Sequence, residues 1–148
     1  MGIRYFAHPV SPRQIAQASE CPRGCYDGHD SWDYWGYSDA PTLDLDKCYP
    51  ELQVLLGGAT PRPSYALVEG AVVLGGYGGW ESFQRIIPVD EVKLIADDLD
   101  DLLSSPAAVA LVECRYGDRD CVSENLPRAR EFARRVADAG FGIHYSIG

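Results

Sequence analysis

The segment Leu43-Asp44-Leu45-Asp46-Lys47 alternates leucine with aspartate before it reaches a lysine. Side chains two residues apart on an extended chain point to the same side, so the leucines share one face and the aspartates the other. Two interpretations stay open. In one, Asp44 and Asp46 are paired carboxylates of a hydrolytic or metal site, with Lys47 as an electrostatic partner. In the other, which we favour, the leucines are buried anchors and an aspartate caps the following helix or its preceding turn.

A helix is expected directly after this segment. Pro50 disfavours helical geometry at Tyr49 and is best tolerated at the first helical position, so the helix should begin near Pro50. Gly57-Gly58 is expected to stop it. Its buried side is formed by Leu52, Leu55 and Leu56.

Upstream, we expect a strand, a helix and a long loop. Residues 3–10 are aromatic and aliphatic, which suits a strand. Ser11 followed by proline is typical of a helix N-cap, and that helix should run to about Glu20. Residues 21–41 show neither helical nor strand periodicity, which predicts a long, ordered loop.

Downstream, residues 66–74 are apolar, and periodicity leaves open whether they form a strand or a short buried helix. Phe83 to Ile87 is expected to be a strand, and residues 88–91 open a helix whose apolar positions recur at helical spacing. Four aspartates of that helix are expected on its solvated side, namely Asp97, Asp98, Asp100 and Asp101.

The last third of the chain completes the pattern. Residues 107–113 are expected to form a helix or a strand, and residues 114–123 a loop. An amphipathic helix then ends at Gly140, and residues 142–147 alternate as a half-buried strand. Helices and strands mix without repeated βαβ units, which indicates the α+β class. We expect residues 1–148 to form one compact domain, with a mixed or antiparallel sheet packed by about four helices.

The charge balance argues against nucleic-acid binding. Thirteen basic and 22 acidic residues give a formal net charge of −9, which repels polyanions. An acidic surface instead suits a basic protein partner, whose approach it would accelerate. No apolar run reaches the length of about 18 residues that a membrane helix needs, so no membrane association is predicted. The start of the chain lacks the pattern of a secretory signal, and we expect a cytoplasmic protein.

Five cysteines occur at spacings that match no zinc ribbon or finger. Cys21, Cys25 and His29 could supply three zinc ligands, with Cys114 or Cys121 as the fourth, but the paired short spacings that mark such sites are missing. We expect free thiols, and a disulfide between loop cysteines is a second, minor option that a reducing cytosol disfavours. No metal and no cofactor is predicted.

The specific catalytic and nucleotide-binding motifs are absent from the sequence. The stretch Gly75-Gly76-Tyr77-Gly78-Gly79 could offer backbone amides to an anion, but nothing basic follows it, and we interpret it as a turn. His8 and His144 lie in the two terminal strands, and acid–base chemistry by either needs an orienting partner that the sequence does not reveal. Enzymatic activity stays open, and we lean against it.

An aromatic cluster in the long loop is the most interesting candidate for a binding surface, because tyrosine and tryptophan combine apolar area with a polar group. The alternative is that Trp32 and Trp35 fold back over the core as a lid. The candidate binding residues of the whole chain are Trp32, Trp35, Tyr37, Asp44, Asp46, Lys47 and Trp80.

Several of these segments occur in the order typical of one bacterial family. The opening Met1-Gly2-Ile3-Arg4-Tyr5-Phe6, the Leu-Asp-Leu-Asp-Lys segment, the glycine-rich turn, the helix start Pro88-Val89-Asp90-Glu91-Val92 and the closing helix and strand together resemble the YfbM-like family, a domain family of unknown function. The resemblance implies a small cytosolic α+β protein without established catalytic residues. Some relatives look like neighbours of toxin systems.

Two functional hypotheses follow. The first is a non-catalytic protein-binding module, including an immunity-type inhibitor that blocks a basic toxin surface with its acidic field and aromatic loop. The second is a small-molecule-binding protein or small enzyme, with a pocket around the Leu-Asp-Leu-Asp-Lys segment, the glycine-rich turn and Trp80.

Overall fold

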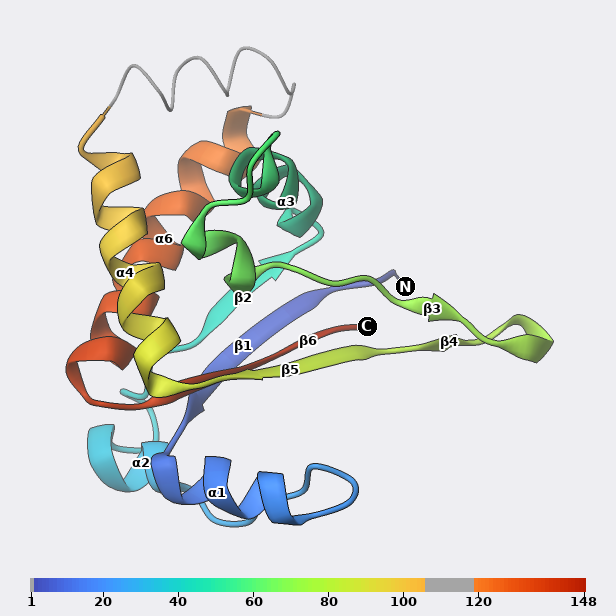
Figure 1. Cartoon of the computed structure of the whole chain (residues 1–148), viewed down its shortest axis with the longest axis vertical. Helices are drawn as coiled ribbons and strands as arrows, with labels where there is room; N and C mark the ends of the chain where they lie inside the picture. The colour runs from blue at the N-terminus through green and yellow to red at the C-terminus, as the bar shows by residue number, and fades with distance from the viewer. Residues whose placement is uncertain (1, 106–118) are drawn as a thin grey trace.

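The computed structural model describes residues 2–105 and 119–148, which form an α+β fold around a four-stranded antiparallel sheet. The strand order is β2-β1-β6-β5, so the first and last strands of the chain lie side by side at the centre (Figure 1). The predicted α+β class is confirmed, and the sheet is antiparallel rather than mixed. The strands are β1 (Tyr5–Val10), β2 (Leu43–Asp46), β5 (Phe83–Ile87) and β6 (Gly142–Ile147).

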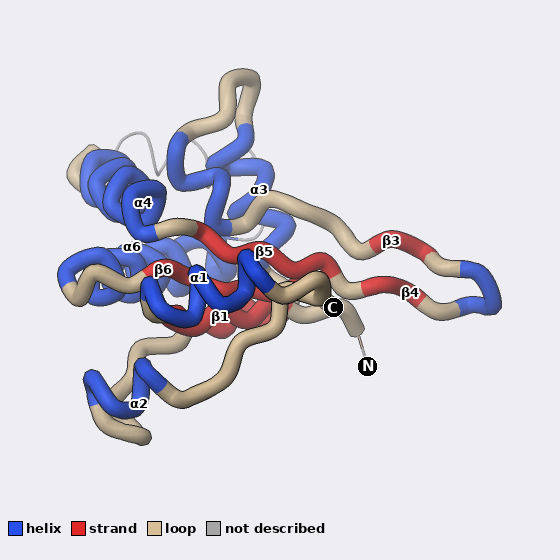
Figure 2. Tube along the Cα trace, turned by 60° about the horizontal axis from the view of Figure 1, so that its bottom comes forward, coloured by secondary structure: helices blue, strands red, loops and turns tan. Residues whose placement is uncertain are grey.

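Helices lie on both sides of the sheet. On one side are α3 (Tyr49–Gly57), α4 (Val89–Leu103) and α6 (Arg119–Asp138), and on the other are α1 (Pro12–Glu20) and α2 (Asp30–Trp35) (Figure 2). In the described ranges, none of these helices has the length and apolar character needed to cross a membrane.

The main core lies between the sheet and the side that carries α3, α4 and α6. The alternation predicted for β6 is confirmed, because Ile143, Tyr145 and Ile147 are buried while His144 and Ser146 face the α1 and α2 side. Two core tyrosines, Tyr5 and Tyr145, stack with their ring centroids 5.3 Å apart. The hydroxyl of Tyr5 donates to the carbonyl of Leu67 at 2.7 Å. This buried ring therefore also fixes the chain at Leu67.

Several predicted elements have different bounds. Residues 66–74 form neither one strand nor one buried helix, but the end of a 3₁₀ helix, η1 (Pro63–Leu67), and a short strand, β3 (Val73–Leu74). The long loop contains α2. The loop predicted for residues 114–123 is wrong at its end, because α6 has begun by Arg119, and the element predicted at 107–113 lies outside the described residues.

The acidic side of α4 is not simply solvated, contrary to the sequence-based expectation. Arg134 of α6 binds Asp97 at 2.7 Å and also bonds Asp100, while Arg62 binds Asp98 at 2.9 Å. Asp98 in addition accepts bonds from the main chain and hydroxyl of Ser64. These aspartates therefore join α4 to α6 and to the start of η1, which a pattern confined to one helix could not reveal.

Candidate functional site

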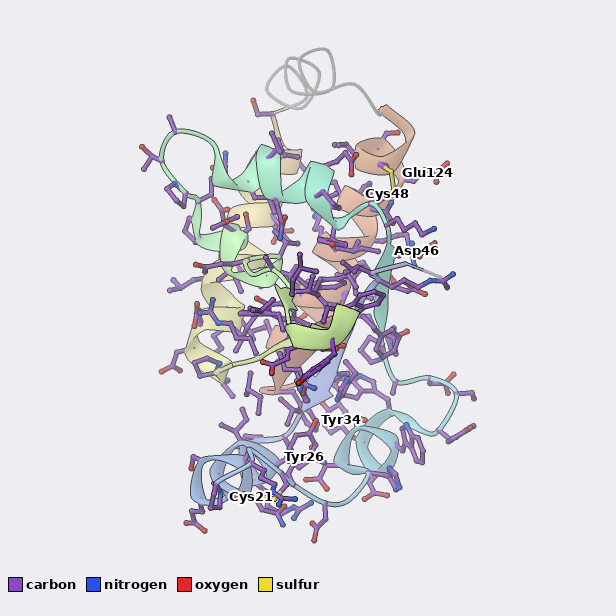
Figure 3. The ribbon with its side chains drawn as sticks, turned by 90° about the vertical axis from the view of Figure 1, so that its right-hand side faces the viewer. Cys21, Tyr26, Tyr34, Asp46, Cys48 and Glu124 are labelled. Carbon is purple, nitrogen blue, oxygen red and sulfur yellow. A yellow bond between two sulfur atoms is a disulfide. The ribbon has the colours of Figure 1, made fainter. Side chains whose placement is uncertain are left out.

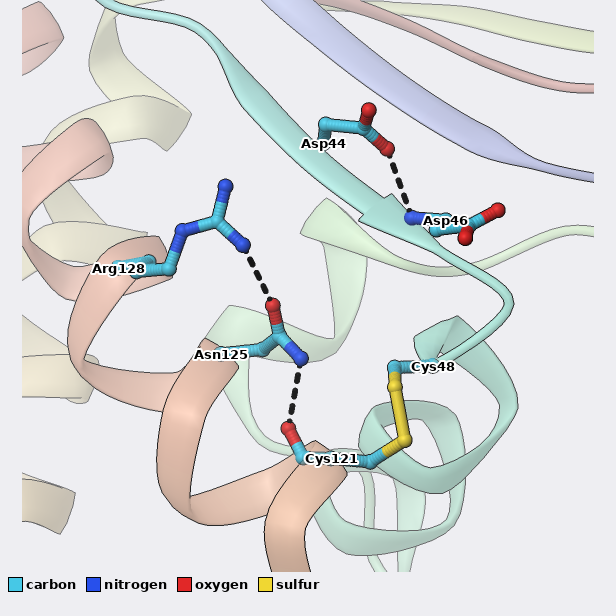
Figure 4. The surroundings of a disulfide bond; sticks show 6 residues. All are labelled: Asp44, Asp46, Cys48, Cys121, Asn125 and Arg128. Carbon is cyan, nitrogen blue, oxygen red and sulfur yellow. Dashed lines mark hydrogen bonds between the residues drawn. A yellow bond between two sulfur atoms is a disulfide. The ribbon is translucent and has the colours of Figure 1, made fainter.

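The Leu-Asp-Leu-Asp-Lys segment forms β2 and the turn after it. Leu43 and Leu45 are buried, and Asp44 and Asp46 are exposed on the opposite face. Asp44 accepts a hydrogen bond from the main-chain N–H of Asp46 at 2.8 Å (Figure 4), and the Asp46 carboxylate lies 3.3 Å from the Arg4 guanidinium. Asp44 therefore stabilises a local turn, in keeping with the structural interpretation of this segment.

The glycine-rich stretch is the tip of a hairpin, formed by β3, the short 3₁₀ turn η2 (Gly76–Gly78) and β4 (Trp80–Glu81). We call residues 73–81 the hairpin arm, because they project beyond the sheet (Figure 1). The arm leads directly into β5, whereas β2 lies at the other edge of the sheet. The structure therefore does not bring Asp44, Asp46 and Lys47 together with Trp80.

The aromatic loop divides into two groups. Trp35 packs on Phe141 with ring centroids 4.9 Å apart and is partly buried against the core, as a lid would be. Trp32 instead stacks on His29 at 3.9 Å and meets Tyr37 edge-on at 4.7 Å. Trp32 and Tyr37 stay exposed, as does Tyr34, which packs edge-on against Trp35. The aromatic loop therefore keeps accessible rings even though Trp35 is partly buried.

A row of hydrogen bonds crosses the sheet face beneath the aromatic loop. Tyr26, whose position is labelled in Figure 3, places its hydroxyl 3.0 Å from Nε2 of His8 and 2.6 Å from Nδ1 of His144. The second nitrogen of His144, Nε2, lies 3.1 Å from Oε1 of Gln84. The two histidines are opposite each other in the β1–β6 register, which is why one tyrosine reaches both.

Both histidines are held neutral by their surroundings. Burial lowers the pKa of His8 to about 4, with a smaller contribution from His144 beside it. Burial also lowers the pKa of His144 and raises that of the Tyr26 hydroxyl. At neutral pH the row therefore consists of two uncharged imidazoles and a protonated phenol.

A cavity of about 560 Å³ opens beside this row. It lies between β1, the start of α1 and the aromatic loop, and its walls include Phe6, His8, Tyr26, His29, Trp32 and Tyr37. The volume falls within the range of roughly 300–1,000 Å³ that is usual for small-molecule sites. We call it the imidazole cavity.

Four of the five cysteines form disulfides, so the expectation of free thiols is wrong for them. Cys21 pairs with Cys25, and Cys48, which precedes α3, pairs with Cys121 of α6 (Figure 4). Both bonds use residues of the zinc site considered from the sequence, and no cluster of metal-ligating side chains occurs within residues 2–105 and 119–148. Cys114 lies outside the described residues.

The sequence drew attention to His8 and His144 but not to the residues that join them. Tyr26 lies within residues 21–41, where no periodicity marks it, and Gln84 carries no signal. An available clue was that both histidines occupy polar positions of the terminal strands, which would face each other if those strands paired.

Comparison with known proteins adds no relative. No family model, no curated protein and no solved structure matches the chain.

Proposed function

We propose that the protein is a non-catalytic protein-binding module that docks through the hairpin arm. The observation that carries this proposal is the exposure of large apolar side chains on the arm. Leu74 and Trp80 form a cross-strand pair with 82% and 48% of their surfaces exposed, and Tyr77 at the tip is fully exposed. Contiguous apolar residues on a protruding element are typical of interaction sites.

The backbone at the tip supports the same proposal. Tyr77 adopts a left-handed conformation with φ of 65°, although it is flanked by glycines that would adopt it more readily. A tyrosine there costs roughly 1 kcal/mol. Such a cost fits a side chain whose role is contact with a partner.

The partner we propose has a basic rim around an apolar pocket. The arm carries one charged residue, Glu81, and no basic one. Arg85, at the base of the arm, is already bound to Glu69 and Glu91 at 3.0 and 2.9 Å. With a net charge of −9, the protein would attract a basic surface, so an immunity-type inhibitor of a basic toxin is the form of module we favour.

Affinity capture from cell extract tests the proposal with three baits. These are the natural chain, the arm variant Leu74→Ser/Trp80→Ser, and the control Leu94→Ser, which alters a 59% exposed leucine on α4. A specific partner should bind the first and third baits and bind the arm variant at least about 30-fold more weakly. Retention should also fall between about 0.1 M and 1 M salt. Equal capture by all three baits, or no protein partner, would contradict the proposal.

The cellular location is part of the same question. The sequence predicts a cytoplasmic protein, whereas two disulfides are more typical of an oxidising compartment. Alkylating the free thiols in intact cells before mass spectrometry distinguishes a reducing from an oxidising compartment. Alkylated Cys48 and Cys121 would support a location in the reducing cytoplasm. An intact disulfide between them would support a location in an oxidising compartment.

A further inference from the structure

The walls of the imidazole cavity carry no formal charge. Thirteen described residues line it, and none of them is aspartate, glutamate, lysine or arginine. Charged residues make up 24% of the chain, so this is an unusual patch of its surface. A charged ligand would find no opposite charge among the lining side chains to offset its loss of hydration.

Aromatic rings supply most of the walls. Phe6 of β1 faces the aromatic loop, from which Trp32 and Tyr37 contribute rings that are still substantially exposed. Trp32 is already supported by His29 on one face. Planar rings bury large apolar areas by stacking, so a flat ligand would gain most from this arrangement.

The row of hydrogen bonds fixes which nitrogen of His8 is free to accept. Oε1 of Gln84 can only accept, so His144 donates from Nε2 and must accept at Nδ1. Tyr26 therefore donates its proton to His144, and its oxygen accepts from Nε2 of His8. Nδ1 of His8 is then left as an acceptor.

That acceptor is accessible to solvent. Nδ1 of His8 has no hydrogen-bond partner among the described residues. It is not buried, however, because Oε2 of Glu51 is the one side-chain polar atom in those residues that is both buried and unpaired. Nδ1 must therefore reach solvent, and His8 lines the imidazole cavity. A buried ligand that donates there would complete the row.

We propose that the imidazole cavity binds an uncharged aromatic or heteroaromatic small molecule that stacks against Trp32 and donates one hydrogen bond to Nδ1 of His8. This is a site separate from the hairpin arm, and either proposal can hold without the other. It also differs from the pocket expected at the Leu-Asp-Leu-Asp-Lys segment.

Indole and N-methylindole are a matched pair of probes, because the methyl group removes the only donor. Titration into the oxidised 148-residue chain, followed by NMR of the tryptophan and histidine side chains, should show indole binding with a dissociation constant on the order of 1 mM. N-methylindole should bind about five-fold more weakly, the value of one neutral hydrogen bond. The largest changes in NMR chemical shift should occur at Trp32 and His8.

Variants separate the donor bond from general packing. In His8→Phe, which keeps a ring but removes the acceptor, indole and N-methylindole should bind equally. Trp32→Ala should weaken both probes, whereas Tyr77→Ala on the hairpin arm should change neither. The pair of probes tests the natural chain even if His8→Phe does not fold. Equal binding of the two probes by the natural chain, or tighter binding of tetramethylammonium or benzoate than of indole, would overturn the proposal.

Discussion

Removing the Cys48–Cys121 disulfide should cost far more stability than removing the Cys21–Cys25 disulfide. The first bond joins residues 73 apart and the second joins residues only 4 apart. A cross-link stabilises mainly by restricting the unfolded chain, and the restriction grows with the logarithm of the loop length. At 25 °C this gives about 4.4 kcal/mol for the long loop and about 1.9 kcal/mol for the short one. The expected difference is about 2.5 kcal/mol.

Urea unfolding of the natural chain and two double variants, Cys48→Ser/Cys121→Ser and Cys21→Ser/Cys25→Ser, measures this difference. The variants are matched, since each loses one disulfide and gains two serines. Serine is well accepted at the position of Cys48, which is the N-cap of α3, so the substitution itself adds little strain. The long-loop variant should also melt roughly 10 °C lower than the natural chain.

Two outcomes would refute the reasoning. If both variants lost the same stability, loop length would not be the source of the stabilisation. If the long-loop variant unfolded at the same urea concentration as the natural chain, α3 and α6 would be held together without the bond. Adding reductant to the natural chain provides an internal check, because it should lower stability at least as far as the long-loop variant.

Three further changes test the fold and the site. As the pH falls from 6.5 to about 4, His8 becomes protonated in the unfolded chain but stays largely neutral in the native one, because burial lowers its pKa to about 4. Urea titrations should therefore show a free energy of unfolding up to about 3 kcal/mol lower at the acid end. His8→Phe should reduce this dependence of stability on pH. Asp98→Asn, which weakens a mostly buried ion pair, should cost about 3 kcal/mol in chemical unfolding, against less than about 0.5 for the exposed Asp101→Asn. Gly142→Ala should lower stability by about 2 kcal/mol in thermal unfolding because its Cβ would lie 2.5 Å from a main-chain oxygen, whereas Gly76→Ala, in open space, should have little effect.

Local signals in the sequence predicted the elements that depend on neighbouring residues. Ser11 caps α1 through a reciprocal bond with Gln14, as the Ser-Pro start indicated. The alternation around His144 gave the right face for each side chain of β6. By contrast, residues 119–123 lack a clear apolar period, although they belong to α6.

The candidate sites depend on pairings between distant residues, which no local pattern contains. The sequence marks His8 and His144 as candidates, but the two are joined through Tyr26 only because β1 lies next to β6. Cys48 and Cys121 likewise meet because α3 packs beside α6. The sequence identifies residues with suitable chemistry, and the fold determines which of them come into contact.

The central place of the last strand also affects how the chain acquires its structure during synthesis. β6 lies between β1 and β5, and the main chains of Arg4 and Gly148 exchange two hydrogen bonds across the end of the sheet. Until the ribosome releases β6, β1 and β5 have no shared neighbour, and the sheet has a gap along its middle. Such distant pairing slows folding, so the nascent chain would expose unpaired strand edges to chaperones until β6 emerges.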